Sequence, residues 1–154
     1  DFLMISDGEA AISVGFENTQ GYKDALQDAC RDGGTQYLQD GVKSAQVYGM
    51  LKEKVDLSRK TLIYVASPGQ LQVVYQAIRN YPDYMGLFPD TLGLVGFDVE
   101  GWTRMTTPAI SAIITPAYQE GVRAMEELVD VLDGKKREGD VVFKNIVKWR
   151  ETTL

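Results

Sequence analysis

The residues best suited to chemistry stand together in the stretch from Gly93 to Thr103, which reads GLVGFDVEGWT. An apolar, strand-like run ends in a carboxylate, Asp98, and a second carboxylate and an indole follow at Glu100 and Trp102. The chain contains no histidine, so the commonest partner of a carboxylate in general acid–base catalysis is missing. An Asp-x-Glu pair could hold Mg²⁺ through its oxygens, but a solvated Glu100 explains the pattern more simply.

Polar side chains also follow the other predicted strands. In parallel sheets, ligands bind beyond the carboxyl ends of the strands, where the connecting loops meet. Four residues could form one hydrogen-bonding rim there: Asn18 after Ala11–Phe16, Ser67 after Thr61–Ala66, Asp98 after Leu92–Phe97 and Thr115 after Ala109–Ile114. A plainer interpretation stays open for each, because Asn, Ser and Asp also suit turns and helix caps. Tryptophan likewise fills cores and interfaces more often than it contacts ligands, which applies to Trp102.

Strands and helices alternate along the chain. The spacing of apolar residues predicts helices over Glu17–Asp32, Lys43–Lys54, Gly69–Asn80 and Ala117–Leu132, with a weak strand at QYLQ and one or two strands in VVFKNIVKWR. The first ten residues show no clear register. This order predicts an α/β fold with a largely parallel sheet flanked by helices.

Composition excludes several classes of protein. The formal net charge of −6 disfavours direct binding to a phosphate backbone, which needs clustered Lys and Arg. A single cysteine, Cys30, excludes an internal disulfide and a cysteine-rich zinc site. No apolar run approaches the roughly 18 residues of a membrane span, and we expect no membrane partner. Because the chain starts with Asp1 and shows no signal segment, we expect it to be a piece of a longer protein.

The motifs in this order resemble those of lactose/galactose-repressor-type transcription regulators. That family has a strand ending in Gly-Phe-Asp, then Pro-x-(Leu/Ile)-(Thr/Ser)-x-(Val/Ile), a proline, and Glu-x-Gly-x-x-Ala opening a helix. The matching segments here are Gly96–Asp98, Pro108–Ile113, Pro116 and Glu120–Ala124. NTQGYKDAL, TLIYVASPGQLQVVYQAI and the closing VVFKNIVKWRETT also fit, so the register holds from about Ala11 to the end.

The resemblance implies one lobe of a periplasmic-binding-protein-like, two-lobed effector domain. Residues 1–154 would be an effector-binding and dimerisation region, with the second lobe in 11–116 and 134–154 and a crossover helix at 117–133. It further implies a cytoplasmic homodimer that binds operator DNA only through a helix-turn-helix headpiece absent from this chain. No catalytic residue, cofactor or metal is expected.

Departures from the family pattern bear on the ligand. Asn18 stands where the family usually has a ligand-gripping arginine, Ser67-Pro68 where it has Asn-Asp or Ser-Asp, and Thr115-Pro116 where many members have Gln-Pro. Losing the arginine removes a clamp for carboxylate or phosphate. The resemblance therefore implies a small neutral sugar as effector. Asp98 would accept bonds from its hydroxyls, each contributing roughly 1.5–3 kcal/mol, and the Trp102 indole could cover an apolar face of the sugar.

The resemblance also implies an interface. The family dimerises through the helix after the middle strand and the loop after Gly-Phe-Asp, which here present Leu71, Val74, Tyr75 and Met105, with Trp102 near the edge. The helix Ala117–Leu132 would carry an apolar face that needs a partner.

Two other functions stay open. One is an extracytoplasmic sugar-binding protein of a transport system, although the closing Arg-Glu-Thr-Thr favours the regulator. The other is an α/β enzyme, which the missing histidine, phosphate loop and Gly-x-Ser-x-Gly elbow disfavour.

Overall fold

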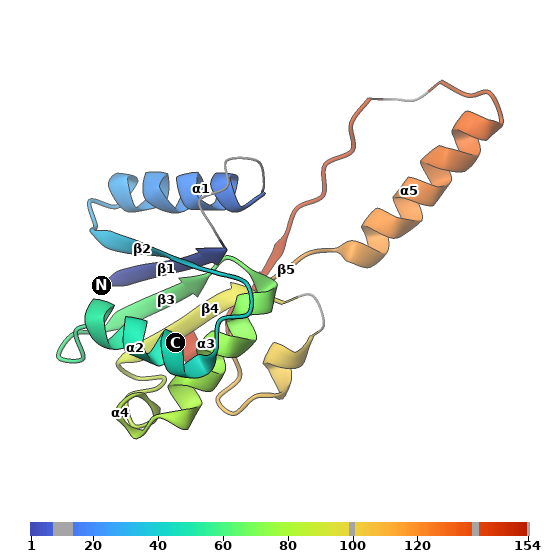
Figure 1. The fold of residues 1–154 in the computed structure, drawn as a ribbon. Helices are drawn as coiled ribbons and strands as arrows, with labels where there is room; N and C mark the ends of the chain where they lie inside the picture. The colour runs from blue at the N-terminus through green and yellow to red at the C-terminus, as the bar shows by residue number, and fades with distance from the viewer. Residues whose placement is uncertain (8–13, 99–100, 137–138, 154) are drawn as a thin grey trace.

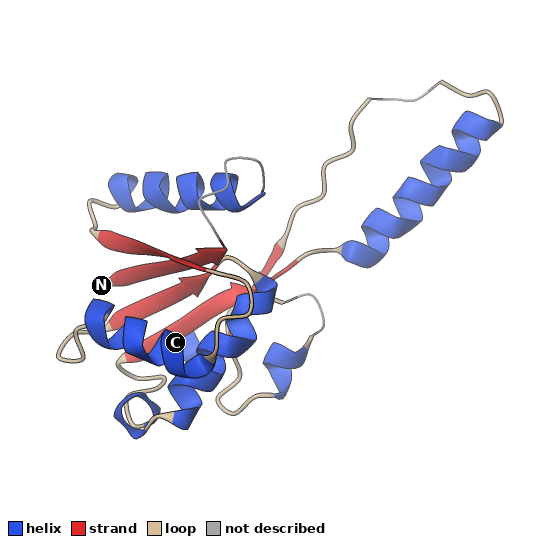
Figure 2. Ribbon diagram, in the orientation of Figure 1, coloured by secondary structure: helices blue, strands red, loops and turns tan. Residues whose placement is uncertain are grey.

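A six-stranded sheet forms the centre of the protein in the computed structural model, which describes residues 1–7, 14–98, 101–136 and 139–153. The strands are β1 (Phe2–Asp7), β2 (Gly33–Leu38), β3 (Thr61–Val65), β4 (Leu92–Phe97), β5 (Ser111–Ile114) and β6 (Ile146–Lys148). Their spatial order is β2-β1-β3-β4-β5-β6. The first five run parallel and β6 pairs antiparallel with β5. The predicted α/β class with a largely parallel sheet is confirmed (Figures 1 and 2).

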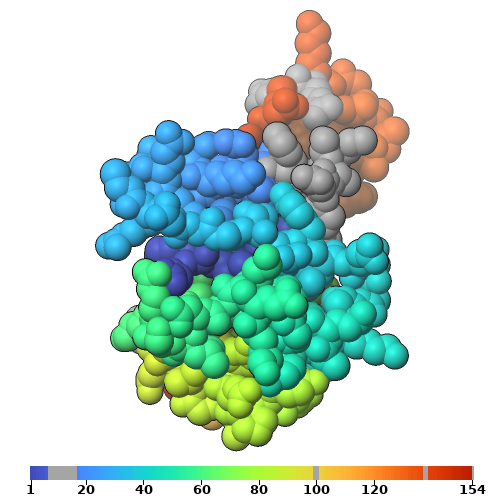
Figure 3. All heavy atoms as spheres, turned by 60° about the vertical axis from the view of Figure 1, so that its left-hand side comes forward, coloured from blue at the N-terminus to red at the C-terminus, as the bar shows by residue number. Residues whose placement is uncertain are grey.

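Helices cover both faces of this sheet. Helix α1 (Val14–Asp28) lies on one face, and α2 (Ser44–Lys54), α3 (Pro68–Asn80) and the short α4 (Pro82–Met85) lie on the other. In the side view of Figure 3, the dark blue start of the chain lies between α1 above and the green segments below.

The hydrophobic core fills the space between the sheet and α2 and α3. Alternation along β3 shows how the strand divides its side chains between the two faces. Ile63 and Val65 belong to the core cluster with Leu71 of α3, whereas Tyr64 lies near Tyr22 of α1, with 6.3 Å between ring centroids. Burial raises the pKa of Tyr64 from its ordinary value of 10.0 to about 12.

The strand β1 is the main feature that sequence reasoning missed. Met4 and Ile5 are buried completely, one facing each side of the sheet, so the strand shows a continuous apolar run instead of alternation. The predicted strand Ala11–Phe16 is wrong where it can be checked, because Val14–Phe16 form the first turn of α1; residues 11–13 lie outside the described residues. Asn18 consequently lies inside a helix and does not follow a strand.

Other predicted boundaries agree more closely. The predicted helix Ala117–Leu132 matches α5 at both ends, and α2 and α3 each start within one residue of their predicted positions. The first helix ends earlier than predicted, at Asp28. Gly33 and Gly34 open β2. A side chain does not fit at Gly33, because a Cβ there would lie 2.3 Å from the Tyr22 hydroxyl.

An arm extends away from the sheet beyond the carboxyl end of β5 (Figure 1). It consists of α5 (Ala117–Leu132) and the returning segment 139–145, and Figure 1 shows both standing clear of the sheet. No residue of α5 is buried. The arm nevertheless exposes large apolar side chains: Tyr118, Val122, Met125, Leu128, Val129, Val131, Leu132, Val141 and Val142.

Past β6, a short 3-10 helix follows, η2 (Glu151–Thr153). Thr152 is fully buried there. Its hydroxyl donates to the Leu94 carbonyl at 2.6 Å and accepts from the Ser111 amide at 2.9 Å. The η2 segment is therefore fastened to both β4 and β5.

Candidate ligand-binding edge

The strand order defines a topological switch point between β1 and β3. From β1 the chain passes outward to β2, and from β3 it proceeds in the opposite direction to β4 and β5. In open α/β sheets, ligands bind in the crevice beyond the carboxyl ends of such strands. Here these ends bring Ser6 next to Ala66, whose amide donates to the Ile5 carbonyl at 2.8 Å.

Ser6 is the residue at this edge that the sequence analysis missed. Its side chain is 0% exposed, and among the described residues its hydroxyl has no hydrogen-bond partner. Leu3 and Ile5 face the core, so alternation directs Ser6 to the opposite, α1-facing side of the sheet. Identifying LMIS as a buried strand would have revealed it, because Ser6 is the polar residue near that strand's end.

Ser67 occupies the N-cap position of α3, as the plainer interpretation expected. Its side chain, however, makes no capping hydrogen bond, and the residue is buried. Its carbonyl accepts from the amides of Gln70 and Leu71, both at 3.2 Å, and Pro68 has no N–H. This helix end therefore keeps at most the Gly69 amide for a ligand, unlike the anion-binding ends that offer several donors.

Gln70 crosses from α3 to the end of β2. Its Nε2 donates to the Leu38 carbonyl at 3.0 Å. The Oε1 atom is buried without a partner among the described residues. A second orphaned acceptor thus lies near the carboxyl end of the sheet.

Asp98 lies deeper than its predicted role suggested. The residue is 2% exposed. Its Oδ1 accepts from the Gly101 amide at 2.7 Å, and its Oδ2 accepts from the Thr103 amide at 3.3 Å and from the Thr103 hydroxyl. The carboxylate therefore organises the turn into the short 3-10 helix η1 (Trp102–Met105). Gly101 permits this turn with a φ of 79°, a conformation that favours glycine.

The structure brings only some of the predicted rim residues to one edge. Ser67, Asp98 and Thr115 follow the adjacent strands β3, β4 and β5. Asn18 is half-buried in α1. Trp102 packs against the core cluster, and its ring centroid lies 6.0 Å from that of Tyr75 on α3.

The residues predicted for the dimer interface divide into two groups. Leu71 and Val74 are fully buried in the core cluster, so placing them on a surface was wrong: their face of α3 packs on this chain's own sheet. Tyr75 is half-buried, and Met105 is 73% exposed. These two, with Trp102, remain available to a partner.

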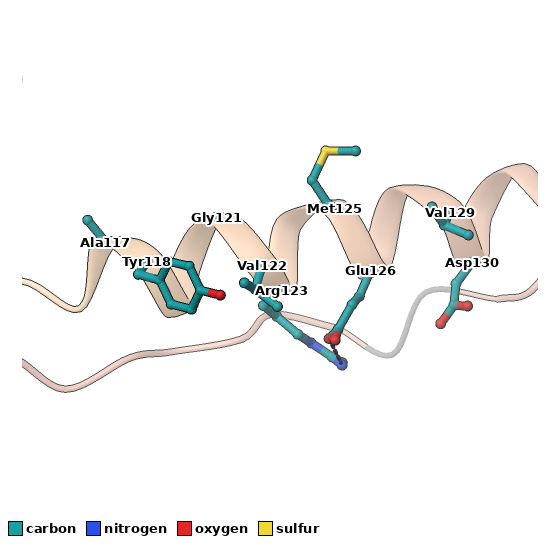
Figure 4. A pocket seen from close by; sticks show the side chains of 9 residues that line it. All are labelled: Ala117, Tyr118, Gly121, Val122, Arg123, Met125, Glu126, Val129 and Asp130. Carbon is teal, nitrogen blue, oxygen red and sulfur yellow. Dashed lines mark ion pairs between the residues drawn. The ribbon is translucent and has the colours of Figure 1, made fainter.

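A hollow also lies elsewhere, along the arm. It measures about 900 Å³ and follows one side of α5, where Figure 4 shows its lining residues: Ala117, Tyr118, Gly121, Val122, Arg123, Met125, Glu126, Val129 and Asp130. Arg123 spans to Glu127 at 2.5 Å and to Glu126 at 3.6 Å. Because one helix supplies all the lining, the hollow is an uncovered helix face and not a closed binding site.

Within the described ranges, no group of three or more His, Cys, Asp or Glu residues is placed to hold a metal ion. In the same part of the chain, no helix is long and apolar enough to cross a membrane.

No protein-family model and no curated protein matches the chain, but solved structures do. A LacI-family regulatory protein from Chloroflexus aggregans is 21% identical with a TM-score of 0.77, over 98% of this chain and 54% of that one. A dimeric Lac repressor with a C-terminal deletion is 17% identical with a TM-score of 0.78, over 100% and 55%.

A sugar-binding LacI-family regulator from Escherichia coli, complexed with phosphate, is 17% identical with a TM-score of 0.73, over 99% of this chain and 54% of that one. The chain thus spans little more than half the length of these transcription regulators. It has the α/β fold of one lobe of their periplasmic-binding-protein-like domain.

Proposed function

We propose that the chain is the effector-binding and dimerisation region of a bacterial DNA-binding transcription regulator, with a small neutral sugar as its effector. The observation that carries the proposal is the match of nearly the whole chain to one lobe of LacI-family regulators. Operator DNA is bound by a separate headpiece, since the net charge of −6 does not suit a phosphate backbone. We place the protein in the cytoplasm and propose that it binds its effector without converting it chemically.

The chemistry of the carboxyl edge supports a hydroxyl-rich ligand. Among the described residues, two buried oxygens near this edge have no hydrogen-bond partner: the Ser6 hydroxyl on the α1-facing side of the sheet and the Gln70 Oε1 on the α3 side. Leaving such an atom unpaired costs about 1–3 kcal/mol. Ser67 and Thr115 add short polar side chains at the neighbouring strand ends. We place the ligand site here, with Asp98, Asn18 and Trp102 as further candidate contacts.

The same edge disfavours an anion. Asp98 brings a carboxylate, and the start of α3 keeps few free amides because of Pro68 and the Ser67 carbonyl. Thermal-shift measurements on the full-length gene product, with D-glucose, D-galactose and glucose 6-phosphate as probes, test the preference, because a ligand that binds only the native state raises its melting temperature. A neutral sugar should give the largest shift. A largest shift with the phosphate would refute the neutral effector.

Asp98 is proposed as the main polar anchor of the ligand. Asp98→Asn should weaken sugar binding at least tenfold, about 1.4 kcal/mol, in calorimetry on the full-length product. Part of this loss arises from the turn, because one amide oxygen cannot serve all the donors that now reach the carboxylate. Unchanged affinity would remove Asp98 from the site altogether.

The proposed homodimer uses the surface formed by Tyr75, Trp102 and Met105. A charge placed in a dimer interface is desolvated and weakens it, so Met105→Glu should shift sedimentation towards the monomer. Met85→Glu is the matched control, because Met85 is also exposed, at 48%, but lies on α4. A dimer that resists Met105→Glu and Tyr75→Glu would place the interface elsewhere. A wild-type monomer at high concentration would refute the assembly.

A further inference from the structure

A chain of hydrogen bonds connects the ligand edge to the C-terminal segment. The Arg150 Nη1 donates to the Thr103 hydroxyl at 2.8 Å and also to the Ile110 carbonyl. The Thr103 hydroxyl in turn bonds Oδ2 of Asp98. A residue four positions from the end of the sequence thereby reaches the carboxylate that shapes the turn after β4.

The donors and acceptors that each group carries fix the direction of these hydrogen bonds. A guanidinium only donates hydrogen bonds, and a threonine hydroxyl carries a single hydrogen. Because Arg150 occupies a lone pair of the Thr103 oxygen, the hydroxyl's one hydrogen is free to go to the Asp98 carboxylate, which only accepts. Thr103 is 0% exposed, so water does not compete for these bonds.

The backbone of Arg150 is itself held in place. Its amide donates to the Ser111 Oγ at 2.7 Å, and its carbonyl accepts from the same hydroxyl at 3.2 Å. The next residue, Glu151, accepts from the Ala109 amide at 2.5 Å. Among the described residues, none of the ion pairs involves Arg150, so its charge acts on the Thr103 hydroxyl and the Ile110 carbonyl.

We propose that Arg150 is a positioning residue for the ligand edge, acting through the Thr103 hydroxyl to fix the Asp98 carboxylate and the turn that it organises. Donation from a cation makes the hydroxyl a better donor to the carboxylate, since linked hydrogen bonds polarise one another. The link to ligand affinity rests on the proposed function, whereas the effect on the turn does not.

Amide hydrogen exchange on this chain tests the proposal without a ligand. The Gly101 and Thr103 amides donate to Asp98 and serve as reporters. The Ala66 amide, bonded to the Ile5 carbonyl, serves as the reference in the sheet. Arg150→Met should accelerate exchange of both reporters at least tenfold relative to the reference.

Two variants of Thr103 separate positioning from general support of the fold. Thr103→Val removes the hydroxyl at nearly constant volume and should reproduce the acceleration. Thr103→Ser keeps the hydroxyl and should retain protection within about threefold of wild type, since only a methyl group is lost. Reporter exchange unchanged in Arg150→Met and Thr103→Val would overturn the proposal. Equal acceleration of reporters and reference in both variants would also overturn it, because Arg150 would then only support the fold.

Sugar affinity is then measured with D-glucose and D-galactose on the full-length gene product. Faster reporter exchange together with weaker sugar binding supports the complete proposal. Faster exchange with no sugar binding even in wild type would refute the sugar site while leaving the positioning of Asp98 established. Faster exchange with undiminished sugar affinity would overturn the role of Arg150 in binding.

Discussion

Two regions of the molecule differ in burial: the sheet with the helices that cover it, and the arm. In both, the spacing of apolar residues in the sequence matches the secondary structure. In the sheet, Leu94 is fully buried against the helices. On α5, the comparable Leu128 is 50% exposed, although α5 is a helix of 16 residues. Helical periodicity thus specifies a helix and its apolar face, whereas the surface that covers this face must come from elsewhere. The arm therefore exposes apolar side chains of the kind that favour association with another surface.

Replacing one leucine of the sheet and one leucine of the arm by alanine should give the largest difference in the free energy of unfolding. Leu94→Ala should lower the free energy of unfolding by about 2–5 kcal/mol, the usual cost of a cavity in a core. Leu128→Ala should change it by less than about 0.5 kcal/mol, as surface substitutions do. Urea denaturation of the two variants measures both values. A comparable loss at Leu128 would mean that the arm is packed in solution.

Two glycines should respond to alanine in different ways. A Cβ on Gly96 would lie 2.6 Å from Leu71 Cδ1 and 3.0 Å from the Val65 carbonyl, so Gly96→Ala should cost about 1–3 kcal/mol. A Cβ on Gly121 in α5 meets nothing within 4 Å. Gly121→Ala should therefore cause no loss and add up to about 1 kcal/mol of helix stability. Denaturation followed by circular dichroism compares them, and a destabilising Gly121→Ala would reveal a surface already lying against the arm.

Thr152 tests how firmly the returning C-terminal segment holds the sheet. Thr152→Val removes the hydroxyl that bonds Leu94 and Ser111 at almost constant volume. The buried Ser111 amide and Leu94 carbonyl then lose a hydrogen-bond partner. This should lower the free energy of unfolding, measured by urea denaturation, by about 1–3 kcal/mol. Thr107→Val, at an exposed position, is the control and should be nearly neutral. A neutral Thr152→Val would show that this segment contributes little to the fold.

The smallest expected effect is at Ser6. Ser6→Ala removes a buried hydroxyl that has no partner among the described residues. Stability should be unchanged or rise by up to about 1 kcal/mol, because an unpaired buried group is lost. Thermal unfolding without ligand measures this, and a clear loss of stability would show that Ser6 has a partner in solution.

Sequence reasoning succeeded where a periodic pattern alone decides the structure. Ala117–Leu132 was predictable to the residue because its apolar side chains recur at helical spacing on one side. The strand β1 was not, because burial on both faces removes the alternation that marks a strand. Missing β1 also misplaced Asn18, since a strand was assigned to residues that open α1.

The candidate site was predictable in outline but not in its contacts. The carboxyl-edge rule placed Ser67, Asp98 and Thr115 on adjacent strand ends. It could not show that Gly101 and Thr103 already bond Asp98, or that Arg150 reaches Thr103 across 47 positions of sequence. Leu71 and Val74 were assigned to a partner because an apolar helix face does not reveal what it packs against.

We propose that the carboxyl edge of this sheet binds a neutral sugar. Amide chemical-shift mapping of the isotope-labelled chain during titration with D-glucose, D-galactose and glucose 6-phosphate tests it most directly. We expect the shifts to be larger with a neutral sugar than with the phosphate, and to be concentrated at Ser6, Ser67, Gly69, Thr103 and Thr115. Shifts absent from this edge at saturating neutral sugar, or largest along α5, would contradict it.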